Sequence, residues 1–148
     1  MRSYLNDFRT TDIRMNDSHF QLLLQAARSQ PEPQRLLLVF VAAGLPAEAS
    51  TEQRASFEAG AGGELEPVMC VDKDPHALKD FEALVTESRQ TGQEWQIVFV
   101  AGLSGRGKNA PSESQTEKAL TDMVEAVRHG SIGGYAAYDA HGKSLSFS

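Results

Sequence analysis

Apolar residues follow two kinds of spacing along this chain. Residues 36–42 are apolar at every position, which is typical of a strand that is covered on both faces. Residues 19–29 instead repeat apolar side chains at helical spacing, which predicts a helix with one buried face. Strand and helix patterns alternate from there to the C-terminus, and this order predicts a mainly parallel sheet with helices on its faces.

Capping residues and helix breakers set the ends of the predicted elements. Three Ser-x-x-Gln pairs, which begin at Ser18, Ser50 and Ser112, form capping boxes that satisfy free amides at a helix start. Asp74 is expected to cap a further helix, with Pro75 at its first position. The helices are expected at residues 19–29, about 50–59, 75–91 and between Ser112 and Gly130. The strands are expected at residues 36–42, 68–71, 95–101, 135–138 and 144–147.

The last two strands are predicted to pair with each other in antiparallel fashion. Residues 139–143 between them form a short loop in which Gly142 is free to adopt a positive φ. We therefore expect a C-terminal antiparallel hairpin in an otherwise mainly parallel, five-stranded sheet.

The order of motifs suggests an internal duplication. Residues 39–42 and 98–101 have the same sequence, Val-Phe-Val-Ala. Each copy is followed by a glycine and a leucine, a Ser-x-x-Gln pair, another glycine, and an apolar strand that ends at Asp72 or Asp139. Similar strands and helices also recur for physical reasons alone, so the pattern has two explanations. We expect two duplicated β–α–β halves, with the two Val-Phe-Val-Ala segments as neighbouring interior strands.

Length and charge limit the architecture and the partners. A chain of 148 residues with a formal net charge of −6 fits one soluble domain and disfavours binding to nucleic acids or anionic membranes. We expect a single α/β domain over residues 17–148 and a flexible N-terminal extension over residues 1–16. No apolar stretch approaches the roughly 20 residues that span a bilayer, and the first residues lack the apolar core of a signal peptide. These features predict a cytoplasmic protein.

Neither a disulfide nor a metal site is expected. The single cysteine, Cys70, lies in the apolar run 68–71 and is interpreted as a buried thiol. The four histidines have no metal-ligand spacing to one another or to the cysteine. We therefore predict no metal and no cofactor.

A glycine-rich loop follows the third predicted strand. Residues 102–108, Gly-Leu-Ser-Gly-Arg-Gly-Lys, fit the pattern G-x-x-x-x-G-K, in which backbone amides and a lysine surround phosphate oxygens. The next residue is Asn109, where a magnesium-binding Ser or Thr is usual, and Pro111 delays the following helix. The alternative is a surface loop that uses glycine for turns and basic residues for solvation. The candidate ligand-binding residues of this loop are Gly102, Gly105, Gly107 and Lys108.

A pair of aspartates follows the second predicted strand. Asp72 and Asp74 are separated by one residue and resemble the pair in haloacid-dehalogenase phosphatases, where the first is the nucleophile and the second the acid or base. His76 stands where that family has Thr or Val. The alternative interpretation is structural, with Asp72 at a strand exit and Asp74 as a helix cap. Both are candidate ligand-binding residues, and no catalytic residue is assigned.

Several segments resemble a family of short proteobacterial proteins. These are residues 36–42, 68–73, 87–92 and 98–107, and the resemblance covers most of residues 18–148. Members of that family are often labelled "ribonucleotide reductase subunit alpha". That catalytic subunit uses several cysteines and this chain has one, so the resemblance implies no activity and no site residues here.

Together these observations favour a non-enzymatic binding or regulatory module that associates with itself or with another protein. This hypothesis rests on a well-patterned fold without a complete set of catalytic residues. The alternative is a small enzyme that binds a phosphate ligand or a nucleotide with residues 102–108.

Overall fold

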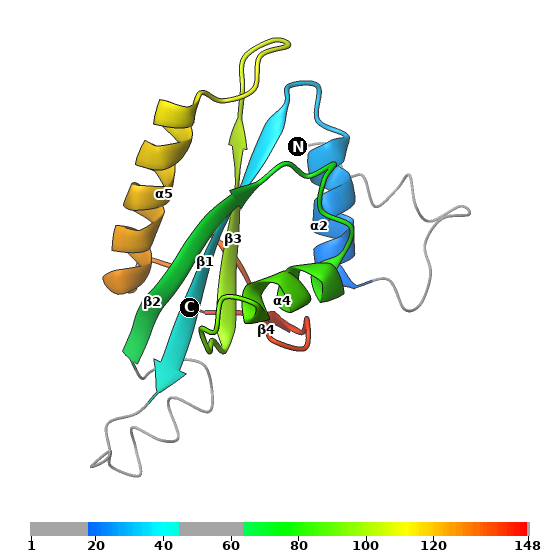
Figure 1. Ribbon diagram of the computed structural model, residues 1–148. Helices are drawn as coiled ribbons and strands as arrows, with labels where there is room; N and C mark the ends of the chain where they lie inside the picture. The colour runs from blue at the N-terminus through cyan, green and yellow to red at the C-terminus, as the bar shows by residue number, and fades with distance from the viewer. Residues whose placement is uncertain (1–17, 45–63, 148) are drawn as a thin grey trace.

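Three helices and five strands account for most of the residues that the computed structural model describes, 18–44 and 64–147 (Figure 1). The helices are α2 (His19–Arg28), α4 (Phe81–Arg89) and α5 (Glu113–Arg128). The strands are β1 (Gln34–Gly44), β2 (Glu64–Lys73), β3 (Ile97–Ser104), β4 (Ala136–Asp139) and β5 (Ser144–Leu145). Helices α2 and α4 cover one face of the sheet, and α5 covers the other (Figure 1).

The strands form one sheet in the order β2–β1–β3–β4–β5, and every neighbouring pair is antiparallel. The predicted mainly parallel sheet is therefore wrong, although the number of strands is correct. Strands β1 and β3 are buried on both faces because helices cover both sides of the sheet. They consequently carry the continuous apolar runs that more often mark parallel strands.

The two Val-Phe-Val-Ala segments are neighbouring interior strands, as predicted. Val39 pairs with Phe99 and Phe40 with Val98 in the antiparallel ladder between β1 and β3. The duplicated β–α–β halves are nevertheless wrong, because such a unit requires parallel strands, and β1–β2 and β3–β4 are antiparallel. The two phenylalanines that the duplication equates also face opposite sides: Phe40 packs beneath α2 and α4, whereas Phe99 packs beneath α5. The helix expected near residues 50–59 lies outside the described residues.

The face beneath α2 and α4, the aromatic face, has a core built around rings. Phe20 of α2 meets Tyr138 of β4 edge to face, with 5.4 Å between ring centroids, and Phe40 meets Trp95 at 5.0 Å. Edge-to-face contacts bring the positive rim of one ring to the negative face of the other. The buried apolar residues of this face are Phe20, Leu24, Leu36, Leu38, Phe40, Leu78, Phe81, Leu84, Trp95, Val98, Val100 and Tyr138.

The face beneath α5, the aliphatic face, has a smaller core with one buried ring. Met123 and Val127 point from α5 onto alternate residues of β1, since successive side chains of a strand face opposite sides of the sheet. Helix α5 itself confirms the helix predicted between Ser112 and Gly130. The buried residues of this face are Leu37, Val39, Val41, Phe99, Met123, Val127, Ile132 and Ala137.

Two of the predicted capping boxes lie in the described residues, and both mark a helix start. At α5, the Ser112 Oγ accepts the Gln115 amide at 3.0 Å, and the Gln115 side chain accepts the Ser112 amide at 2.8 Å. At α2, the Ser18 Oγ accepts the Gln21 amide at 3.0 Å. The third pair, at Ser50, lies outside the described residues.

Helix α4 is shorter than the predicted helix over residues 75–91. The Asp80 carboxylate accepts the Ala83 amide at 2.8 Å, so the helix begins at Phe81. The predicted helix cap at Asp74 is wrong because its carboxylate closes a turn instead, accepting the His76 amide at 2.9 Å.

The C-terminal antiparallel hairpin is confirmed. Strands β4 and β5 pair antiparallel, and the Asp139 amide donates to the Lys143 carbonyl at 3.0 Å across the loop. Gly142 has a φ of 86°, which is favourable only for a residue without a side chain. The loop that follows β4 therefore has the glycine where the turn requires one.

Strand β2 is an outer strand of the sheet, and this position corrects the expected burial of Cys70. The Cys70 side chain is exposed. Among the described strands β2 pairs with β1 alone, so its residues receive less cover than those of β1 and β3. An apolar run on an outer strand does not imply burial of every residue in it.

Candidate binding groove

A groove of about 650 Å³ lies between α2 and the sheet on the aromatic face. Cavities that hold small ligands usually measure about 300–1,000 Å³. One wall of the groove comes from α2 and the other from β1, β3 and the start of β4. The lining residues are His19, Leu23, Ala26, Ala27, Gln30, Gln34, Leu36, Val100, Ala101, Gly102, Gly134, Tyr135 and Ala136.

The α2 wall is one face of the helix. His19, Leu23, Ala27 and Gln30 recur every three or four residues, the spacing that places side chains above one another on a helix. Leu23 and Ala27 are half-buried against the aromatic core. The helix thus presents an apolar centre, with a polar side chain near each end.

The sheet wall is low because its side chains are short. Leu36 pairs with Gly102 across the β1–β3 ladder, and Val100 pairs with Ala136 across the β3–β4 ladder. Paired residues of an antiparallel sheet lie on the same face, so all of these residues lie on the side of α2. The missing side chain of Gly102 and the single methyl of Ala136 leave the space that forms the groove.

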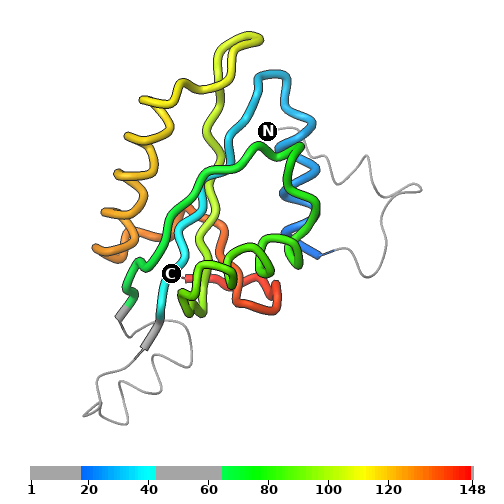
Figure 2. The backbone as a smooth tube through the Cα atoms, viewed as in Figure 1, coloured from blue at the N-terminus to red at the C-terminus, as the bar shows by residue number. Residues whose placement is uncertain are grey.

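Strand β3 has an open edge beside this groove, formed by the outer side of residues 101–104. Strand β4 begins at Ala136, opposite Val100, so no described strand pairs with β3 beyond Val100. The Gly105 amide donates to the Pro33 carbonyl on the β1 side at 2.8 Å. Because backbone groups alternate in direction along a strand, the N–H and C=O of Gly102 point away from β1 toward the open edge. Figure 2 shows β3 running past the level of β4 toward the turn that precedes α5.

Two glutamine side chains present acceptor oxygens at the groove. The Gln34 Nε2 donates to the Glu32 carbonyl at 3.2 Å and to the Ser104 Oγ at 2.8 Å. The Gln30 Nε2 donates to the Ala26 carbonyl at 3.3 Å. A carbonyl oxygen accepts only from the nitrogen end of an amide, so these contacts identify the oxygen end of both side chains. Their Oε1 atoms are left to accept a hydrogen bond from a ligand.

The third polar side chain of the lining is anchored to the core. His19 Nδ1 lies 2.6 Å from the hydroxyl of Tyr138, which is fully buried. The imidazole is exposed, and its other nitrogen is free of this contact. The ring therefore stands at the mouth of the groove in a fixed orientation.

The lining carries no formal charge of its own. The chain contains 14 basic and 20 acidic residues, yet among the residues that the structure describes none that lines the groove is Asp, Glu, Lys or Arg. A charged ligand group would lose water there without gaining an opposite charge. The groove thus favours a neutral ligand with an apolar body and hydrogen-bond donors.

The residues predicted from the glycine-rich loop are divided between two places. Gly102 lines the groove, while Gly105, Gly107 and Lys108 belong to the turn between β3 and α5. In that turn the Arg106 amide donates to the Asn109 carbonyl at 2.9 Å, and the Asn109 amide donates back at 2.8 Å. Two of the amides that a phosphate cradle needs are thus used within the turn. Lys108 is exposed.

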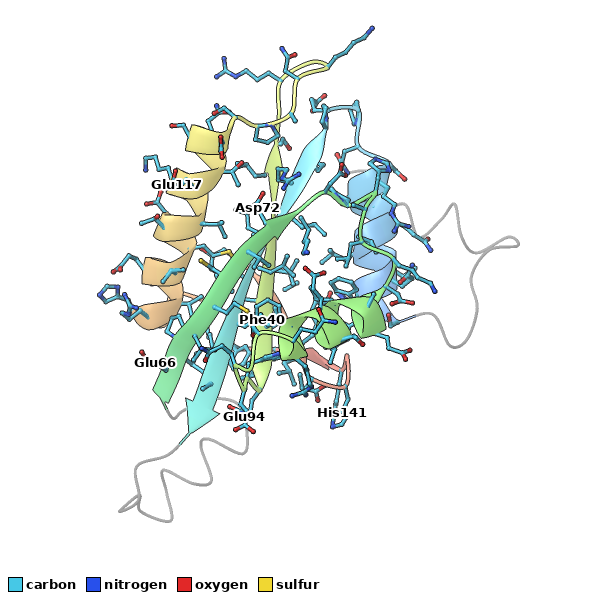
Figure 3. All side chains as sticks on the ribbon, in the orientation of Figure 1. Phe40, Glu66, Asp72, Glu94, Glu117 and His141 are labelled. Carbon is cyan, nitrogen blue, oxygen red and sulfur yellow. The ribbon has the colours of Figure 1, made fainter. Side chains whose placement is uncertain are left out.

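Asp72 lies on the opposite face of the sheet from Gly102. Asp72 pairs with Leu37 of the aliphatic face and forms an ion pair with Arg35, whose Nε donates to Oδ2 at 2.9 Å. Both side chains line a second cleft, of about 490 Å³, beside α5. Asp72 and Glu117 are labelled in Figure 3 on the two elements that enclose this cleft.

The six predicted ligand-binding residues therefore do not form one site. Gly102 belongs to the groove, Asp72 to the second cleft, and Asp74 to the turn after β2. Sequence reasoning missed His19, Gln30 and Gln34. Their only signal is the position of His19 and Gln30 on one helical face, and chain order does not show which part of the sheet that face meets.

Within the described residues, no group of three or more His, Cys, Asp and Glu side chains is placed to hold a metal ion. No helix among them is long and apolar enough to cross a membrane. Comparison with known proteins finds no matching protein-family model, no matching curated protein and no matching solved structure. The function is therefore inferred from the chemistry of the groove itself.

Proposed function

We propose that this chain is a non-enzymatic binding module whose ligand occupies the groove between α2 and the sheet. The observation that carries the proposal is a neutral groove with an apolar wall on α2 and the acceptor oxygens of Gln30 and Gln34, the second of which is positioned by two protein contacts. Sites of this kind select a ligand by shape and by a few placed hydrogen bonds.

The composition of the lining supports binding rather than catalysis. The lining residues within 18–44 and 64–147 include no carboxylate, thiol, amine or aliphatic hydroxyl, the groups that usually serve as nucleophiles. The one imidazole, that of His19, is held by Tyr138 at 2.6 Å and faces no such nucleophile in the groove. A general base without a partner to activate gives no reaction by itself.

The proposal is tested with benzamide as a probe, because it joins an apolar ring to a neutral amide with N–H donors. We expect it to shift the ¹⁵N resonances of α2 and Gly102 with a dissociation constant of roughly millimolar size, as is usual for a fragment of this size. Benzoate has the same ring with a negative charge, and we expect it to bind at least fivefold more weakly, since desolvation of a charge is unfavourable.

Matched tryptophan variants locate the binding. Ala26 lines the groove, and Ala26→Trp fills it; Ala77 is exposed in the turn before α4, and Ala77→Trp is the control. Benzamide binding is expected to disappear in the first variant and to persist in the second. Binding that survives Ala26→Trp, or shifts that map outside the groove, would contradict the proposal.

A further inference from the structure

We propose that the ligand is an extended, neutral peptide segment that adds to the sheet as a strand along the open edge of β3. This inference rests on the proposed function and specifies the chemical class of its ligand. The incoming segment would lie beside residues 101–104, past the point where Gly134 and Tyr135 lead into β4, and would place alternate side chains in the groove beneath α2.

The backbone of the open edge provides the recognition. Gly102 is exposed, and its N–H and C=O point away from β1. Outward backbone groups of this kind are the template onto which an additional strand binds. Their direction is fixed by the rest of β3, so the edge is preorganised and binding orders little of the protein.

The positions along the open edge have room for another backbone. Gly102 has no side chain, and Gly134, which also lines the groove, precedes β4 on the side where the new strand would lie. A Cβ placed on Gly102 would meet the Gln34 Oε1 at 3.5 Å, an ordinary van der Waals distance. An alanine at position 102 would therefore fit without a clash.

The lining of the groove indicates which side chains the bound segment would carry. Leu23, Ala26 and Ala27 form the apolar wall, so inward side chains should be small or branched and apolar. The free Oε1 atoms of Gln30 and Gln34 accept N–H or O–H groups, which a peptide backbone or a Thr, Ser or Asn side chain supplies. Charged side chains have no oppositely charged partner among the described lining residues.

The other long outer edge, that of β2, is protected against strand addition. Pro67 lies within β2 and has no amide hydrogen to donate, and the β1–β2 register shifts between Phe40 and Val41 next to it. Glu66 is exposed on the same strand. Proline, irregular register and charge are the devices that block edge pairing, and the open edge of β3 contains none of them.

The test uses the full chain and the probe peptide acetyl-Thr-Val-Thr-Val-Thr-amide, compared with the same peptide carrying N-methyl groups on both valines. N-methylation removes the backbone donors and keeps the side chains. We expect the unmodified peptide to bind and to shift the amide resonances of residues 101–104, while the methylated peptide binds at least tenfold more weakly, corresponding to the loss of more than one net hydrogen bond.

Two variants at one position examine the protein side. Gly102→Ala keeps the outward N–H, and Gly102→Pro removes it without breaking a bond to β1, because that N–H points away from β1. We expect the proline variant to bind the peptide roughly three- to tenfold more weakly than the alanine variant. Circular dichroism checks that both variants fold. If the proline variant does not fold, strand addition is tested by comparing the affinities of the unmodified and N-methylated peptides for the unaltered protein.

The outcomes separate this inference from the proposed function. Equal binding of both peptides would overturn strand addition and leave the groove as a binding site. Binding of benzamide without binding of either peptide would overturn the peptide class alone. Failure of both probes would remove the proposed function and this inference together. A concentration-dependent dimer in light scattering that the unmodified peptide dissociates would support strand addition and identify a second copy of this chain as an occupant.

Discussion

The two faces of the sheet are both covered by helices, but their cores are built from different side chains. The aromatic face buries Phe20, Phe40 and Tyr138 beneath two helices, and beside them it has a neutral groove. The aliphatic face buries mostly Val, Leu and Met side chains beneath α5, and its cleft contains the Arg35–Asp72 ion pair. One sheet thus has a neutral cavity on one side and a charged one on the other.

The difference between the two faces explains how the uncharged groove forms. Large rings fill the centre of the aromatic face and fix the distance between α2 and the sheet. At the end of the groove nearer the β3–α5 turn, the side chains become small, as at Ala26, Ala27 and Gly102, so this distance is no longer filled. On the aliphatic face the corresponding space is occupied by long polar side chains, which expose charge to the cleft.

The largest expected effect concerns the two cores. Phe40→Ala removes a fully buried ring from the aromatic face and should lower the free energy of unfolding by about 4 kcal/mol. Met123→Ala on the aliphatic face should lower it by roughly 2–3 kcal/mol, because a flexible side chain leaves a space that neighbours fill more easily. Urea unfolding followed by circular dichroism measures both. An equal or larger loss for Met123→Ala would contradict the expectation that the aromatic face contributes more to stability than the aliphatic face.

A smaller effect is expected from a hydrogen bond between side chains that links α4 to Trp95, two residues before β3. The Trp95 indole N–H donates to the Ser88 Oγ at 2.8 Å, and the two residues are 2% and 4% exposed. Ser88→Ala leaves that N–H without its partner and should lower the free energy of unfolding by about 2 kcal/mol. In a Trp95→Phe background the same substitution should cost much less. A cost that does not change between the two backgrounds would show that the bond contributes nothing specific.

The smallest effect is expected at the ion pair of the aliphatic face. The Arg35 and Asp72 side chains are 31% and 34% exposed, so water screens their attraction. Arg35→Met should lower the free energy of unfolding by less than about 1 kcal/mol, and the difference should shrink in high salt. Unfolding curves at low and high sodium chloride measure it. A loss as large as that of Ser88→Ala would mean that this cleft, and not the aromatic face, holds the critical polar contact.

Much of the fold was readable from local pattern. The continuous apolar run over residues 36–42 correctly predicts a strand buried on both faces, and Ser112 with Gln115 correctly predicts the start of α5. The direction of the strands was not readable, because helices on both faces impose the same composition on an antiparallel interior strand. Cys70 was misplaced for a related reason: its apolar neighbours do not show that β2 is an outer strand.

The groove was not readable from local pattern. Gly102 was predicted as part of a phosphate-loop pattern, but in the structure it pairs with Leu36 and lines the groove beside α2. Gln30 and Gln34 carry no motif, and their role depends on contacts with the Ala26 carbonyl and the Ser104 hydroxyl. A site assembled from a helix and three strands is defined by tertiary contacts, and spacing along the chain does not record them.

The turn between β3 and α5 gives the molecule a practical attachment point. Arg106 and Asn109 close the turn through their own backbone bonds, and Gly107, with a φ of 57°, lies at its tip. Neither bond reaches the sheet, so a short affinity tag or a dye-labelled sequence inserted after Gly107 would extend a surface loop. Such an insertion would allow the protein to be immobilised with α2 and the edge beyond Ala136 left accessible to solution.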